Sequence, residues 1–551
     1  MRAAVAVAIA GLLSLGPALG LADMPKQTLG DLVRAGKRES VLAAITSPDV
    51  DVNEQAPDGS TALMWATFNV DRELVRALLK AGAKADGVNH YGASALGEAV
   101  KVDDLELVKV LLDAGADVNS PNTDDQTALL TAVSLGSVPV AKLLIERGAD
   151  VNRVETFRGQ NALMWAAGNN QPEILELLLA NGANNVDLRA KFDDWPRQMT
   201  SEPRAQFQSR QTGGLTALLY ATRSGCYTCA VALVKAGADV NKPNPDGLTP
   251  MLNALDNKRF DIAMFLLDKG ANPTTWDMSG RTPLYVAVDM NSYRPGGGLL
   301  GGGGVGQNAR GSGQGEAAPA AGQDNVKPMQ VVNRLLAMGV DTNHQLTRKR
   351  PYGAGRGRFA DYDLRGGVGP LMVAAMRHDD EAIAALLAHG AEVDLPNVFQ
   401  MTPLMLAVGM SGTTRGAGGG APVEGDFQES AIRTVDLLLA AGADVNARIR
   451  DSRTHTATLM AYVAGRDQEG RTVLMGAAEA GRDKVVKHLL AKGADPVVRD
   501  ASGKSALDIA KSAPAPAPGA RTTGPSAAER AAIVALLEPL TPPATKQADA
   551  K

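Results

Sequence analysis

The chain has 551 residues and a nearly balanced charge, with 56 Lys and Arg against 60 Asp and Glu for a net charge of −4. Apolar residues make up 45% of the sequence but aromatic residues only 4%, which fits short helices packed through Ala and Leu. Beyond an N-terminal run, no stretch is long and apolar enough to span a bilayer, so stable membrane insertion of the mature protein is not expected.

Residues 1–22 have the pattern of a secretory signal peptide. Arg2 precedes an apolar run over residues 3–15, and Gly16-Pro17 and small residues follow up to Ala22. We expect cleavage after Ala22 and a mature protein that is periplasmic or secreted. An uncleaved anchor is the alternative, against which Gly16-Pro17 argues. No Cys follows the apolar run, so a lipoprotein anchor is not expected.

Residues 126–152 contain the unit from which most of the chain is built. The hydroxyl of Thr127 can cap a helix N-terminus, and the apolar run after it ends at Gly136. A second run, residues 140–145, has helical spacing and stops at Gly148, which can adopt the left-handed conformation that ends a helix. The unit is therefore predicted to be a helix, a tight turn and a second helix.

This unit recurs, in many places with a period of 33 residues. Helix openings are separated by this step at residues 61, 94 and 127, at 216, 249 and 282, and at 369 and 402. A period of 33 residues with paired helices resembles the ankyrin repeat. The motifs that carry the resemblance are a Gly before the opening, a Thr-Pro-Leu core (Thr282-Pro283-Leu284, Thr402-Pro403-Leu404), and Gly-Ala-Asp-Val-Asn after the second helix, starting at Gly115, Gly148, Gly237 and Gly442. The family's His after Leu is consistently replaced, as at Met64, Leu130 and Tyr285.

The resemblance implies an all-α solenoid of about 11 ankyrin repeats behind an N-terminal capping repeat. We expect the cap in residues 23–55, repeats in 56–188, 212–343, 366–447 and 467–540, and a disordered tail in 541–551. Glycine-rich inserts, 296–323 and 411–425, interrupt two of the repeat blocks. The last repeat contains an Ala-Pro linker before a closing helix over residues 527–537.

Three further insertions, 189–211, 344–365 and 448–466, share one position in the repeat. Each lies between the second helix of one repeat and the opening of the next, where the ankyrin fold makes its finger turn. Their net charges are +2, +4 and +3 on an otherwise acidic chain. We expect these basic fingers to contact an acidic surface of a partner; the alternative is solvated loops that balance local acid. The predicted contact residues of the second insertion are Arg348, Lys349, Arg350, Arg356 and Arg358, and the aromatic residues of the three are Phe192, Trp195, Phe207, Tyr352, Phe359, Tyr362 and Tyr462.

A second predicted contact surface follows from the register of the first helix. In the ankyrin fold the residue four places after the opening Thr points outward into the concave groove. Here Trp65, Trp165 and Tyr220 place large aromatic side chains at this position, and such residues dominate interface energetics. Trp65 and Trp165 are predicted to line one recognition surface; the alternative is that these rings pack on the adjacent finger loops. The same register holds Glu98, Thr131, Asn253, Val286, Val373, Leu406, Gly476 and Ile509.

The two cysteines, Cys226 and Cys229, are three residues apart at the start of a second helix. Cys229 occupies a position that is apolar in the other repeats and is expected to be buried. Three interpretations remain open: a structural disulfide in an oxidising compartment, two reduced core residues, or thiol-redox or metal chemistry. No His follows the pair, so covalent haem attachment is not expected.

No set of residues in the sequence assembles a catalytic or metal site. The six histidines are scattered, and neither HExxH nor GxSxG occurs. We therefore predict a non-enzymatic, monomeric scaffold without a cofactor or metal, which binds a protein and not nucleic acid. The alternatives are a polyanion or cell-envelope binder that uses the basic insertions, and a thiol-redox protein that uses Cys226 and Cys229.

Overall fold

The computed structural model describes residues 28–192, 213–291, 326–346, 367–397, 400–410, 427–450, 469–512 and 526–542. These residues form 24 α-helices and a short 3-10 helix, η2 (Glu538–Leu540), and contain no β-strand. The all-α fold class is thus confirmed. The predicted signal peptide, both glycine-rich inserts, the Ala-Pro linker and most of the tail and of the three insertions lie outside the described residues.

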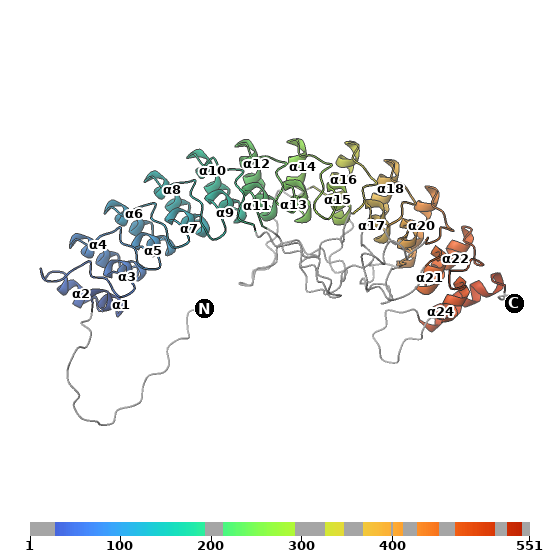
Figure 1. The fold of residues 1–551 in the computed structure, drawn as a ribbon, viewed down its shortest axis with the longest axis horizontal. Coiled ribbons are helices and arrows are strands. Elements are labelled where there is room, and N and C mark those ends of the chain that lie inside the picture. The colour runs from blue at the N-terminus through green and yellow to red at the C-terminus, as the bar shows by residue number, and fades with distance from the viewer. Residues whose placement is uncertain are drawn as a thin grey trace, which may run out of the picture. The chain divides into compact units, whose positions relative to one another are not determined.

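The chain divides into two compact units, residues 1–149 and 150–551, and each is described by itself. In the first unit, helices alternate between two rows (Figure 1). Each helix of the first row packs on the next helix of that row, from α1 to α7. The first row contains α1 (Leu29–Arg34), α3 (Ala62–Phe68), α5 (Ala95–Lys101) and α7 (Ala128–Leu135); the second row contains α2 (Arg38–Ala44), α4 (Arg72–Lys80), α6 (Leu105–Asp113) and α8 (Val138–Glu146).

The second unit shows the same alternation over eight helix pairs (Figure 1). Consecutive helices pack on one another along both rows. Its first row contains α9 (Ala162–Gly168), α11 (Ala217–Ser224), α13 (Pro250–Asp256), α15 (Pro283–Asn291), α17 (Pro370–Met376), α19 (Pro403–Ala407), α21 (Val473–Glu479) and α23 (Ala506–Ser512). Its second row contains α10 (Pro172–Ala180), α12 (Tyr227–Lys235), α14 (Phe260–Asp268), α16 (Pro328–Ala337), α18 (Asp380–Ala388), α20 (Phe427–Ala440), α22 (Asp483–Ala491) and α24 (Ala527–Leu537).

First-row helices begin where the repeated Thr predicts. The hydroxyl of Thr61 accepts the backbone N–H of Met64, and the hydroxyls of Thr127 and Thr282 bind the corresponding N–H groups of Leu130 and Tyr285. Such a cap is worth about 1 kcal/mol. Met64, Leu130 and Tyr285 are the residues that replace the family's His, and all three side chains are buried. The replacement therefore places apolar side chains in the core without disturbing the helix start.

An asparagine after each of several repeats ties that repeat to the next. In the first unit, Asn53 donates to the carbonyl of Gly82 and accepts the N–H of Lys84, at 3.1 and 2.8 Å. In the second unit, Asn343 and Asn446 make the same bond to Gly390 and Gly493, 47 residues further on. Each of these two bonds joins the repeats on either side of an insertion, which is the second insertion for Asn343 and the third for Asn446. The repeats are therefore tied together across both insertions.

Candidate recognition surface

In the first unit, Trp65 is half-buried on α3, next to two exposed side chains. The ring of Phe68, one turn later, stands edge-on to it with a centroid separation of 5.8 Å. The guanidinium of Arg34, the last residue of α1, lies 5.3 Å from the Trp65 ring centroid. Phe68 is 55% exposed, and Arg34 is also exposed. The three side chains form an aromatic and cationic cluster at the surface.

The Trp65 ring rests on the first row. A Cβ atom at Gly30 of α1 would lie 3.7 Å from Cδ1 of Trp65, an ordinary van der Waals contact. The tryptophan thus covers the small residue of the preceding first-row helix and leaves its other side partly in solvent. The adjacent helix, in addition to any finger loop, is therefore a packing partner of this ring.

In the second unit, Tyr220 on α11 occupies the equivalent position. Its ring lies over Gly168 of α9, where an added Cβ would come within 3.3 Å of Cδ1. The Tyr220 hydroxyl binds Nε2 of Gln160 at 2.5 Å, so the phenol is held at both ends. The guanidinium of Arg223, one turn later, lies 4.9 Å from the ring centroid. A half-exposed ring beside an arginine is thus present here as well.

Trp165 is also half-buried, on α9, the helix against which α11 packs. Its indole Nε1 is buried and has no hydrogen-bond partner among the described residues. A buried N–H without a partner costs about 1–3 kcal/mol, so this ring is held by its packing.

The outward register does not continue through the second unit, which corrects the prediction for that part of the chain. Asn253 is 3% exposed and Val286 1%, and Val373, Leu406, Gly476 and Ile509 are also buried. Two contacts give the physical reason. Asn253 donates to the carbonyl of Leu219 and to Thr222 on α11, each at 2.8 Å. A Cβ at Gly476 would clash with Met410, whose side chain fills that space.

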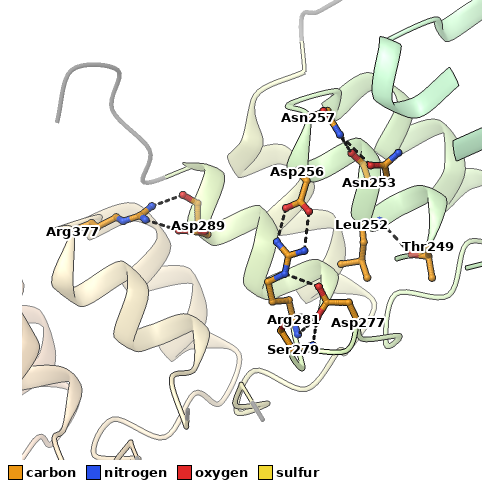
Figure 2. A network of polar contacts seen from close by, with 10 residues as sticks. All are labelled: Thr249, Leu252, Asn253, Asp256, Asn257, Asp277, Ser279, Arg281, Asp289 and Arg377. Carbon is orange, nitrogen blue, oxygen red and sulfur yellow. Dashed lines mark hydrogen bonds and ion pairs between the residues drawn. The ribbon is translucent and has the colours of Figure 1, made fainter. Parts of the chain in front are cut away.

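Buried ion pairs join the repeats where the register is buried (Figure 2). Arg281 makes two parallel bonds to Asp256, at 2.8 and 2.9 Å, and a third to Asp277 at 2.7 Å. Burial alone would lower the pKa of Arg281, but the charges of the two aspartates outweigh it and the pKa is raised. Arg377 pairs with Asp289 at 2.6 Å in the same way. The charges of both arginines are therefore used to neutralise buried aspartates within the fold.

Cys226 and Cys229 lie at the start of α12, which packs on α11, the helix that carries Tyr220. The two sulfur atoms are at bonding distance, 1.94 Å, and the backbone N–H of Cys229 points to Sγ of Cys226 at 3.2 Å. Cys226 is 2% exposed and Cys229 is fully buried, as its register predicts. Among the described residues no group of His, Cys, Asp and Glu could hold a metal ion.

The bases of the three insertions are built alike, although Arg348, Lys349, Arg350, Arg356 and Arg358 lie outside the described residues. Each base is closed by a pair of antiparallel backbone hydrogen bonds. A side chain at each base also donates to a carbonyl of the following finger: Arg189 to Pro243, Gln345 to Pro396 and Arg448 to Arg499, at 2.6, 2.8 and 2.6 Å. The backbone pairs are Ala190 with Leu215 and Gly214 with Lys191, Leu346 with Val368 and with Gly367, and Ile449 with Arg471 and with Gly470.

Three residues of the surface were missed in the sequence. Phe68 and Arg223 stand three positions after Trp65 and Tyr220, a spacing that places side chains on one helix face and could have revealed them. Arg34 lies on the preceding helix, and only the repeat alignment brings it to Trp65.

None of the helices in the described ranges is long and apolar enough to cross a membrane. A family model for ankyrin repeats in three copies matches residues 29–122, 98–190 and 218–294, and one for ankyrin repeats in many copies matches residues 463–510. A comparison with curated proteins found no match.

Proposed function

Because the chain belongs to the ankyrin-repeat family, whose repeats generally mediate protein–protein interaction, we propose that it is an exported, non-enzymatic scaffold for a protein partner. The observation that carries this proposal is the half-exposed state of Trp65, Trp165 and Tyr220. A repeat that served only to stack would bury this register, as the second unit does from Asn253 onward. Large aromatic residues left partly in water are typical of interface hot spots.

The basic insertions would add long-range attraction to these contacts. Their bases leave the repeat at the same point, and each is fixed to the next finger by a side-chain hydrogen bond. Loops of net charge +2, +4 and +3 rooted in this way would steer an acidic partner toward the molecule.

Export is supported by the pattern of residues 1–22 and by cysteines at disulfide distance, which fit an oxidising compartment. The burial of both sulfur atoms favours a structural disulfide over thiol-redox work, since a redox partner has to reach a sulfur atom.

The test uses the mature protein, residues 23–551, as bait in the compartment to which it is exported. We expect a retained protein whose capture falls at least about fivefold when Trp65 and Trp165 are both changed to Ala, equal to about 1 kcal/mol. The matched control is Leu105→Ala, which removes an exposed apolar side chain from a second-row helix. Equal capture by the double variant and the wild type would refute the proposal.

The role of the insertions is tested by reversing charge. Changing Arg348, Lys349 and Arg350 to Glu should slow association and flatten its salt dependence, with little effect on dissociation. Association that ignores both salt and these substitutions would remove the insertions from the proposal. It would favour the interpretation of these segments as solvated loops.

A further inference from the structure

Many arginines in the described part of the chain are paired with a carboxylate. In the first unit, Arg72 pairs with Asp104 at 2.8 Å and Arg147 with Asp113 at 2.8 Å. In the second unit, Arg281 and Arg377 are buried in the pairs of Figure 2. A paired guanidinium has its charge satisfied within the fold.

Arg34 and Arg223 differ from these paired arginines. Each lies beside a half-exposed aromatic ring of the first row, 5.3 Å from Trp65 and 4.9 Å from Tyr220. Neither makes an ion pair or a hydrogen bond with a side chain in the described part of the chain. The contrast is sharp within the capping repeat, where Arg38, four residues after Arg34, pairs with Asp71 at 3.5 Å and also with Glu73. Among the described residues, two uncompensated arginines are therefore found at the aromatic register positions, while others without a carboxylate lie elsewhere, such as Arg158 beside Phe157 and Arg482 beside Phe427.

An arginine beside an aromatic ring is preorganised to bind a carboxylate. The ring face attracts the guanidinium plane and restricts its motion, while the N–H groups at the edge of the plane stay available. A carboxylate fits that edge with two parallel hydrogen bonds. The adjacent ring offers apolar area to the next residue of the same ligand. In the first unit that area is increased by Phe68, 55% exposed.

From this arrangement we propose that Arg34 and Arg223 are specificity-determining residues for an acidic peptide segment, one that carries an Asp or Glu next to an apolar side chain. The inference rests on the proposed function and names the chemical class of its partner. Each unit supplies one such position. The proposed function, a scaffold for a protein partner, favours a peptide over a nucleic acid as the source of these acids.

The test selects random linear peptides, displayed on phage, against the mature protein. Wild-type protein should enrich peptides with an acid beside an apolar or aromatic residue. The double variant Arg34→Gln and Arg223→Gln should lose the acidic preference, and the Kd of the best wild-type peptide should rise about tenfold or more.

The matched control is the double variant Arg147→Gln and Arg334→Gln. It removes the same total charge, from arginines that are paired on the second row of each unit. Because exposed ion pairs contribute about 0–1 kcal/mol, the control should fold normally and keep the acidic preference.

Four outcomes would overturn the inference. Peptides enriched without acids would refute the acidic class and leave the proposed scaffold function standing, and so would an absence of enrichment when the capture experiment still retains a protein. An equal loss in the control variant would show a non-specific charge effect. Tighter binding of single-stranded oligodeoxythymidylate than of any peptide, lost in the Arg34 and Arg223 variant, would assign the arginines to phosphate.

Discussion

Helices α11 and α13 are neighbours in the same row, yet they use one register for different purposes. On α11 the register residue, Tyr220, is half-exposed and lies beside Arg223, which has no carboxylate partner in the described structure. On α13 the register residue, Asn253, is buried and bonded back to α11, and Arg281 from the next finger is held by two aspartates. The same register position can thus leave a ring partly in solvent or hold neighbouring repeats together.

The largest expected effect is the loss of stability when the buried arginine of this comparison, Arg281, is removed. Arg281→Ala leaves Asp256 and Asp277 without their cation in an interior site, which should cost about 3–5 kcal/mol of folding free energy. Arg223→Ala should change stability by less than about 0.5 kcal/mol, because that arginine serves no buried charge. Urea unfolding followed by circular dichroism measures both variants. Equal shifts would mean that the two arginines do not differ as proposed.

The next effect concerns α12, which packs behind α11. Cys226→Ser with Cys229→Ser should lower stability by about 2 kcal/mol, the chain-entropy value for so short a loop. The hydroxyl at position 226 can still accept the N–H of residue 229, so the helix cap is kept when the crosslink is removed. Thiol labelling of the denatured, unreduced mature protein should find no free thiol. Two free thiols would support the interpretation as reduced core residues.

A smaller effect is expected from the hydrogen bonds that join the α11 repeat to the α13 repeat. Asn241 donates to Gly270 at 3.1 Å and accepts the N–H of Asn272 at 2.7 Å, which ties the α11 repeat to the α13 repeat. Asn241→Ala should cost about 1–2 kcal/mol for the two exposed bonds. Asn446→Ala removes the same pair of bonds later in the unit and should cost the same. A much larger cost at one position would show that the joints are not equivalent.

The smallest effect is a pH dependence in the first unit. Burial raises the pKa of Asp104, but the hydrogen bond from Arg72 and those from the α6 backbone outweigh it, so the pKa is lowered overall. A depressed pKa contributes stability above the unfolded value of about 3.9, and this stability is lost as the pH falls below about 4. Asp104→Asn should reduce that acid-induced loss. An unchanged pH profile in the variant would contradict the assignment.

Local chemistry explains how much of the fold could be predicted. Thr caps, left-handed glycines and the 33-residue step mark helix ends independently of what surrounds them, and the closing helix has the predicted bounds, Ala527–Leu537. Exposure could not be predicted in this way. Register states which side of a helix a residue occupies, but Gly476 is buried because Met410, from another repeat, fills the space beside it. Arg34 was missed for the same reason, since its partner ring lies on a different helix.

We propose that, at the register position four residues after the opening of each first helix, exposed side chains bind the partner and buried side chains stabilise the fold. The most direct test compares Tyr220→Ala with Val286→Ala, which occupy that register in the same unit and are half-exposed and buried respectively. Each variant is measured for capture of the partner retained by the wild type and for urea unfolding. Tyr220→Ala should weaken capture about fivefold or more, with a smaller loss of stability than Val286→Ala. Val286→Ala should lower stability by about 2 kcal/mol and leave capture by the folded protein unchanged. The opposite pattern, with capture lost at Val286 and retained at Tyr220, would contradict the account.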